Sequence, residues 1–167
     1  MASRELQRIK PGEMEVVRKY LTTKPVKLGG MASELGLNVR LSALEPGISG
    51  MIEASGNTYT IKINRHETRE RQRFTLAHEI AHFLLHRDLI DSEGSIRDNV
   101  LYRSGQPENI EFEANRLAAD LVMPDGPIKE DLAKIKSPLT DEVLEFLARQ
   151  WQVSKAAMEI KLGPVMA

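Results

Sequence analysis

The sequence contains no cysteine among its 167 residues. Disulfide bonds and thiolate metal ligands are therefore excluded, and any metal must be held by histidine and carboxylate side chains. No apolar stretch is long enough to span a bilayer, and the first residues, Met-Ala-Ser-Arg-Glu-Leu-Gln-Arg, form no apolar signal peptide. An excess of basic residues is also lacking, since the net charge is −1, so no overall positive field attracts the chain to nucleic acid or membranes. These absences predict a cytoplasmic protein.

The composition that is present, 41% hydrophobic and 28% charged, is typical of a soluble globular protein. A chain of this length can bury a core within one domain. We expect a single domain over residues 1–167, with a core at about 11–136 and a C-terminal helical segment at about 137–167.

The most informative stretch reads H-E-x-x-H from His78 to His82, with no proline or glycine to interrupt a helix. On a helix the two histidines lie one turn apart on the same face, where both can reach one zinc ion at about 2.0–2.1 Å. Glu79 lies about 100° round the helix, where it can contact a water on the metal without being a ligand, as a general base must. The pattern also arises by chance. The surrounding residues are apolar, however, and a buried helix with three polar side chains needs something to satisfy them, such as a metal.

A catalytic zinc ion usually has three protein ligands and one open position. On the helix expected near 107–123, Glu111 and Asn115 are polar residues on a face of small apolar side chains. We predict Glu111 as the third ligand and Asn115 as a hydrogen-bond acceptor for a ligand histidine. A buried Glu–Asn network without metal is the open alternative. Glu113 falls on the opposite face and is expected in solvent.

The residues after the H-E-x-x-H pattern are less informative. His86 lies about 12 Å along the helix from His78, so it cannot share the metal and is expected to be an ordinary histidine at a helix end. Residues 87–106 are polar and predict an irregular loop, either a rim over the site or a solvated connection. Tyr102 and Arg103 in this loop are candidate donors to an oxyanion.

Hydrophobic periodicity predicts the other elements. Helices are expected near 11–22, 25–36, 128–135, 140–151 and 154–162. Strands are expected at 37–42, 48–53 and 58–64, with the last two forming a hairpin. The fold class is therefore α+β, mostly helical, with a small antiparallel-containing sheet packed on the H-E-x-x-H helix.

The last two expected helices faintly resemble a helix-turn-helix. Basic residues are sparse there, which favours a packing element over a DNA reader. The side chains expected to face inward are Val143, Leu144, Leu147, Trp151, Ala157 and Ile160.

Two separated motifs, Arg71 to His82 and Glu111 to Pro124, resemble the ImmA/IrrE family of zincin-like metallopeptidases. The resemblance covers roughly residues 15–124. It implies a zincin-like fold and a Zn²⁺ ion held by His78, His82 and Glu111, with Glu79 as general base. Asn115 stands where many related zincins carry an aspartate. The resemblance also implies a protein substrate, a helix-turn-helix repressor encoded nearby, whose cleavage releases mobile-element or stress-response genes.

Two functions stay open from the sequence. The first is a zinc endopeptidase. The second is a non-catalytic regulatory or antitoxin-like protein that binds a partner or DNA and retains a metal site. The presence of Glu79 favours the enzyme, because a structural metal site does not need it. Membrane association and direct nucleic-acid binding are not expected.

Overall fold

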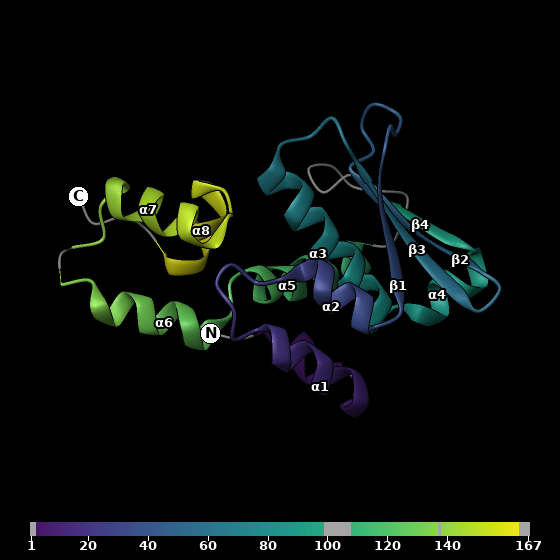
Figure 1. Cartoon of the computed structure of the whole chain (residues 1–167), viewed down its shortest axis with the longest axis horizontal. Helices are drawn as coiled ribbons and strands as arrows, with labels where there is room; N and C mark the ends of the chain where they lie inside the picture. Colours follow the sequence, from purple (N-terminus) through teal and green to yellow (C-terminus); the bar gives the residue numbers. More distant parts are fainter. Residues whose placement is uncertain (1–2, 99–107, 137, 164–167) are drawn as a thin grey trace.

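The computed structural model describes residues 3–98, 108–136 and 138–163, and in these ranges helices outnumber strands. Figure 1 shows the sheet at one end of the molecule and α6, α7 and α8 at the other, with α3 and α5 between them. The elements in chain order are η1 Arg4–Arg8, α1 Pro11–Tyr20, α2 Leu28–Glu34, β1 Leu37–Ser42, β2 Gly50–Ser55, β3 Thr58–Asn64, α3 Arg69–Leu85, α4 Arg87–Glu93, β4 Ser95–Asp98, α5 Glu108–Val122, α6 Asp125–Lys134, α7 Asp141–Trp151 and α8 Lys155–Leu162. The predicted α+β class is confirmed.

The described strands form one mixed sheet in the order β1-β3-β2-β4. β2 and β3 form the predicted antiparallel hairpin, which turns at Gly56 with a φ of 63°. β1 pairs parallel with β3, whereas β4 pairs antiparallel with β2. The alternation in β1 predicts a half-buried strand, but only Leu37 is buried in it, and Val39 and Leu41 are 38% and 61% exposed. The strand order places β1 and β4 at the two edges of this sheet.

α4 and β4 occupy the first part of the segment predicted to be an irregular loop, so that prediction is wrong over residues 87–98. α4 buries only Ile90 and ends at Gly94, whose φ is 85°. β4 pairs with β2 through its buried Ile96. Elements this short and this polar do not repeat an apolar residue often enough to produce a detectable period, which explains the error. Residues 99–106 of the predicted loop lie outside the described residues.

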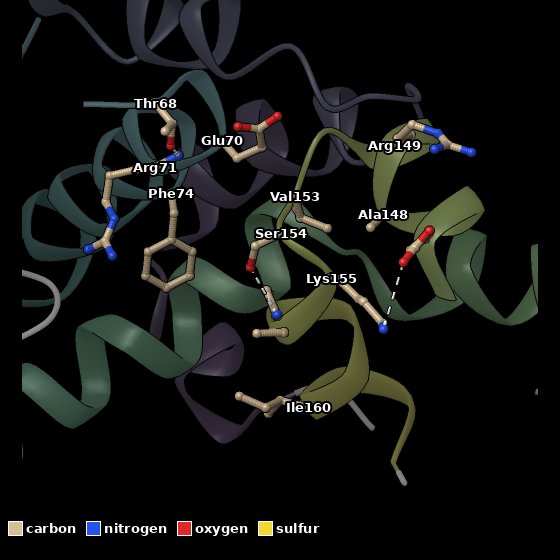
Figure 2. Close-up of a pocket in the computed structure, with 13 residues that line it drawn as sticks. Thr68, Glu70, Arg71, Phe74, Ala148, Arg149, Val153, Ser154, Lys155 and Ile160 are labelled. Carbon is tan, nitrogen blue, oxygen red and sulfur yellow. Dashed lines mark hydrogen bonds and ion pairs between the residues drawn. The ribbon is translucent and has the colours of Figure 1, made fainter. Parts of the chain in front are cut away.

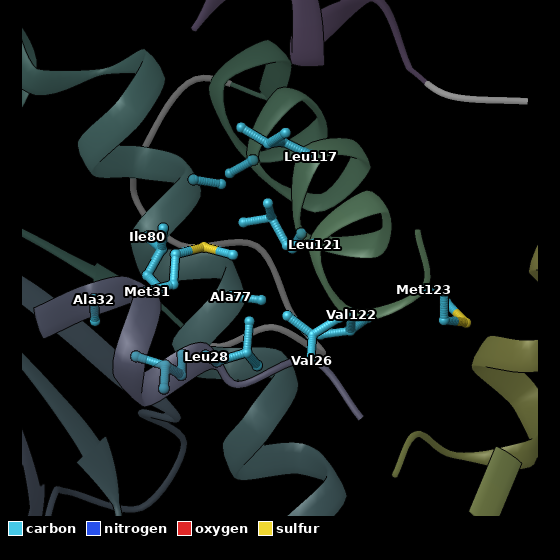
Figure 3. Packing of buried hydrophobic residues seen from close by; sticks show 14 of the residues in the cluster. Val26, Leu28, Met31, Ala32, Ala77, Ile80, Leu117, Leu121, Val122 and Met123 are labelled. Atoms are coloured by element: carbon cyan, nitrogen blue, oxygen red, sulfur yellow. The ribbon is translucent and has the colours of Figure 1, made fainter. Parts of the chain in front are cut away.

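α3 is the central helix, and the H-E-x-x-H pattern lies within it. Thr68 caps its N-terminus by accepting a hydrogen bond from the backbone N–H of Arg71, and every residue from 75 to 84 is buried. The helix packs on β2 and β3 on one side and on α5 on the other. Figure 3 shows Ala77 and Ile80 of α3 facing Leu117 and Leu121 of α5. Both helices also carry other fully buried alanines, which permit a close approach.

The C-terminal helices begin at side-chain caps. Thr140 and Ser154 accept hydrogen bonds from the backbone N–H groups of Val143 and Ala157. Trp151 is buried and its Nε1 donates to Asp131 of α6 at 2.9 Å. Of the other predicted inward residues, Leu144 and Leu147 are buried as well, and Val143 and Ala157 are partly buried against the core. Ile160 is 85% exposed, so its predicted inward position is wrong. Ile160 lies two residues beyond the buried Met158, which turns it about 200° away from the buried face of α8.

A groove of about 630 Å³ separates the first turns of α3 from α7 and α8 (Figure 2). Thr68, Arg71 and Phe74 line one side, and Val153 and Ile160 belong to the other. Neither motif histidine lines this groove. Within the described ranges, no helix has both the length and the apolar character needed to cross a membrane.

Candidate metal centre

The fold brings the three predicted metal ligands together. His78 and His82 are fully buried on one face of α3, with ring centroids 4.7 Å apart. Glu111 reaches them from α5. Its Oε2 lies 3.3 Å from Nε2 of His78, and its Oε1 lies 3.2 Å from Nε2 of His82.

A fourth residue, Asp98, joins them at the end of β4. Its Oδ2 lies 3.5 Å from Nε2 of His78 and 3.2 Å from Nε2 of His82, and the residue is fully buried. The sequence interpretation misses Asp98 because it places this segment in a loop. No periodicity signals this strand, because its four residues include a single buried apolar one, Ile96, which pairs with Ile52 of β2.

The donor set fits a zinc ion. Zinc bonds to nitrogen and oxygen of about 2.0–2.2 Å place two donors of a tetrahedron about 3.3–3.6 Å apart. The four distances above between histidine nitrogens and carboxylate oxygens, 3.2–3.5 Å, are close to this separation of donors. Within the described part of the chain, Nε2 of His78 and of His82, Oε1 of Glu111 and both oxygens of Asp98 have no hydrogen-bond partner. Buried polar atoms without a partner are costly, and a metal ion would satisfy them together.

The side of each histidine that faces away from the cluster is held by a hydrogen bond. Nδ1 of His78 donates to Oδ1 of Asn115 over 2.8 Å. This bond places the proton on Nδ1 and leaves the lone pair of Nε2 directed at the cluster, as a ligand needs. Asn115 therefore lies where an acceptor is predicted.

His82 has its own partner, which is His86. The two Nδ1 atoms are 2.9 Å apart, and Nε2 of His86 donates to Oε1 of Glu113 at 2.8 Å. Because the single proton of a neutral His86 lies on Nε2, where it is donated to the carboxylate, Nδ1 of His86 is the acceptor for Nδ1–H of His82. Burial lowers the pKa of His86 despite the opposing effect of Glu113, which keeps this ring neutral. His86 does not join the four donors, as expected, but it is not the ordinary helix-end histidine that the sequence predicts.

Glu113 corrects a second expectation. The helix spacing places it in solvent, yet its side chain is only 19% exposed. Arg8 of η1 donates to its Oε2 at 2.6 Å, while His86 donates to the other oxygen. Burial raises the pKa of Glu113, but the hydrogen bonds from His86 and Arg8 outweigh it and lower the pKa below its usual range. The predicted solvent face of α5 is in fact covered by the N-terminal segment.

Glu79, the predicted general base, is fully buried beside the cluster rather than within it. Burial raises its pKa well above the ordinary value, and the nearby carboxylates of Asp98 and Glu111 raise it further. Neither oxygen of Glu79 has a hydrogen-bond partner among the residues described. A carboxyl with a raised pKa next to a potential metal site is typical of proton transfer.

The ligand cluster carries strongly opposed charges. Burial lowers the pKa of His78, but the carboxylates of Asp98 and Glu111 outweigh it and raise the pKa to about 9. Burial raises the pKa of Asp98, yet the rings of His78 and His82 hold it below its usual range. The metal-free cluster therefore binds a proton at neutral pH that a metal ion would displace.

Tyr102 and Arg103, the candidate oxyanion donors, lie outside the described residues. Their placement relative to Glu79 and the four donors stays a prediction.

Comparison with known proteins shows where this arrangement belongs. No curated protein matches the chain. A Mycobacterium tuberculosis transcriptional regulator of known structure superposes with a TM-score of 0.61 at 13% identity, over 99% of this chain and 49% of that one. The likeness shows a shared fold, and this chain spans about half the length of that protein. A family model described as IrrE N-terminal-like domain, Peptidase M78, matches residues 32–163. Since that match takes in most of the chain, the four clustered donors and Glu79, the chain belongs to the IrrE N-terminal-like domain family of peptidases.

Proposed function

We propose that this protein is a zinc-dependent endopeptidase in which His78, His82 and Glu111 hold the metal and Glu79 is the general base. The observation that carries the proposal is the group of buried donor atoms without hydrogen-bond partners in the described ranges, with a buried carboxyl of raised pKa beside it. A bound zinc ion would supply Lewis-acid activation of water and of the scissile carbonyl.

The proton transfers fall to Glu79. Its carboxylate accepts a proton from the attacking water as the new carbon–oxygen bond forms. The same carboxyl then gives that proton to the amide nitrogen as the carbon–nitrogen bond breaks, so the two products are a carboxylic acid and an amine. Burial and the neighbouring carboxylates suit this role, because they raise the affinity of Glu79 for the proton that it must carry.

Asn115 and His86 orient the two histidines. Asn115 accepts the Nδ1 proton of His78, and His86 accepts that of His82, so both rings present Nε2 to the same point. Asn115 lies on α5 and His86 lies at the junction of α3 and α4, so the two rings are oriented independently of each other.

The edge strand β4 supports binding of an extended substrate. One side of β4 pairs with β2, and the cluster residue Asp98 is its last residue. A substrate strand added to an open sheet edge gains main-chain hydrogen bonds, which recognise any extended peptide. Such pairing along β4 would carry a peptide bond past Glu79. Tyr102 and Arg103 follow β4 in the sequence and are our proposed donors to the oxyanion.

We propose a helix-turn-helix repressor encoded nearby as the substrate, cut to release mobile-element or stress-response genes in the cytoplasm. Membership of a peptidase family supports a protein substrate. The resemblance of both motifs to ImmA/IrrE peptidases supports the repressor, and the structural neighbour from Mycobacterium tuberculosis is named a transcriptional regulator. The non-catalytic alternative is less favoured because it leaves Glu79 without a role. Direct DNA binding by α8 is also disfavoured, since Lys155 and Lys161 already lie within ion-pair distance of acidic side chains.

The test compares the wild type with Glu79→Gln, which keeps the shape of the side chain and loses its basicity. Each protein is loaded with zinc and incubated with the product of the neighbouring gene, and the fragments are identified by mass spectrometry. We expect cleavage by the wild type, and no cleavage by Glu79→Gln at equal zinc content. Cleavage by Glu79→Gln at the wild-type rate would refute the role of Glu79. Unchanged zinc affinity in Glu111→Ala, measured by chelator competition, would refute the ligand set.

A further inference from the structure

The cluster offers one donor more than a hydrolytic zinc site needs. Such a site usually has three protein ligands and keeps its fourth position open for water. Here Asp98 approaches the two histidines almost as closely as Glu111 does. The distances from its Oδ2 to the two Nε2 atoms are 3.2 and 3.5 Å, against 3.2 and 3.3 Å for the oxygens of Glu111.

Among the described residues, the Asp98 carboxylate is directed at the two ligand histidines and lies at ion-pair distance from both. The residue is fully buried, and neither carboxylate oxygen has a hydrogen-bond partner in the ranges that the structure describes. A buried carboxylate is costly unless a positive charge neutralises it. A metal ion held jointly with His78, His82 and Glu111 provides one.

The backbone fixes Asp98 at this place. Its carbonyl accepts a hydrogen bond from the N–H of Ser49 at 2.9 Å, and the residue pairs with Gly50 of β2. The carboxylate therefore leaves the cluster only if its side chain rotates or the end of β4 separates from β2. Glu79 is also a neighbour of Asp98, which places the carboxylate of Asp98 beside both the histidines and the base.

We propose that Asp98 is a fourth protein ligand that closes the metal site in the resting protein. The ion then has no position free for water until this carboxylate moves away. The consequence for catalysis rests on the proposed function, but the ligand role itself does not.

Cobalt(II) replaces zinc in the test because its visible absorption reports the number of ligands. The cobalt-loaded full-length protein is titrated with azide, a small anion that binds only to an open metal position. We expect no spectral change in the wild type and a saturable change in Asp98→Ala. Chelator competition should show zinc affinity lowered in Asp98→Ala by at least about 10-fold, the lower end of effects seen for groups around a metal. Arg97→Ala is the matched control, since it alters an exposed side chain of the same strand, and it should behave as the wild type in both measurements.

Azide binding to wild-type protein as readily as to Asp98→Ala would overturn the proposal, as would unchanged zinc affinity in Asp98→Ala. If circular dichroism shows that Asp98→Ala does not fold, Asp98→Asn replaces it. The neutral amide is a weaker ligand, so lower zinc affinity supports the proposal and equal affinity refutes it. Failure of the proposed function would appear differently: the zinc-loaded protein would not cleave peptide, while the spectrum of the cobalt-loaded protein would still show four ligands.

Discussion

Gly50 lies where β2 comes closest to the H-E-x-x-H helix, and replacing it with alanine tests this packing. A Cβ at Gly50 would lie 2.4 Å from Cγ2 of Thr75 and 3.1 Å from the backbone oxygen of Lys62. It would also lie 3.4 Å from Oε2 of Glu79. Gly50 is not one of the glycines with a positive φ, so the obstacle is space and not backbone strain.

The expected cost follows from these distances. Ordinary van der Waals contact begins at 3.4 Å, so the new methyl group approaches Thr75 about 1 Å too closely. Thr75 is fully buried and Lys62 contributes a backbone atom, so neither yields easily. Overpacking of this kind costs about 1–3 kcal/mol, and we expect Gly50→Ala to lower the free energy of unfolding by that amount. The shift of α3 should also displace Glu79 and lower the rate of peptide cleavage.

The assay is urea unfolding in the presence of a chelator, so that metal binding does not contribute to stability. Gly29→Ala is the matched control, because its Cβ would meet nothing within 4 Å. It should be as stable as the wild type, or more stable by about 0.4–1 kcal/mol.

Thr75→Ser removes the clashing methyl group and should cost about 1 kcal/mol alone. The double variant Gly50→Ala/Thr75→Ser should then be less destabilised than the sum of the two single variants, by an interaction energy of about 0.5–3 kcal/mol. Strict additivity, or a Gly50→Ala variant as stable as Gly29→Ala, would refute the argument.

Three other predictions follow from the hydrogen bonds around the cluster and from η1. Asn115→Ala should lower zinc affinity or activity by about 10–100-fold, while Asn115→Asp should raise zinc affinity; chelator competition measures the affinity of both variants. Unchanged zinc affinity in the alanine variant would make Asn115 a core residue only. His86→Ala and Glu113→Ala should each lower the zinc affinity by about 10–100-fold, although the sequence alone predicts no effect of Glu113. Unaltered zinc affinity in both variants would contradict the series of hydrogen bonds from His82 to Glu113. The hydrogen bond from Arg116 lowers the pKa of Glu5 from 4.5 to about 2, so the unfolded chain binds more protons than the folded one between these values. The stabilisation from Glu5 is then complete above pH 4.5 and is lost as the pH falls through 2, and the difference in unfolding free energy between the wild type and Glu5→Gln should shrink over this range.

The parts of the site on long helices could be predicted from the sequence. The four-residue spacing of His78 and His82 places them on one face of α3, and Asn115 follows the periodicity that marks one face of α5 as apolar. Asp98 could not be predicted, because its position depends on the pairing of a four-residue strand with a distant hairpin. Glu113 is misplaced for a related reason. Its spacing correctly sets it away from Glu111, but spacing does not show that another segment covers that side.

That covering segment has a consequence for the metal site. Arg8 of η1 reaches His82 through Glu113 and His86, in an unbroken series of hydrogen bonds. If docking of η1 helps to orient His82, thermodynamic reciprocity requires the metal to strengthen the docking of η1 by the same free energy. Amide hydrogen exchange in η1 should therefore slow when zinc is added, and Glu113→Ala should remove most of that protection. The metal content of the protein would then be detectable at its N-terminal surface, far along the chain from either histidine.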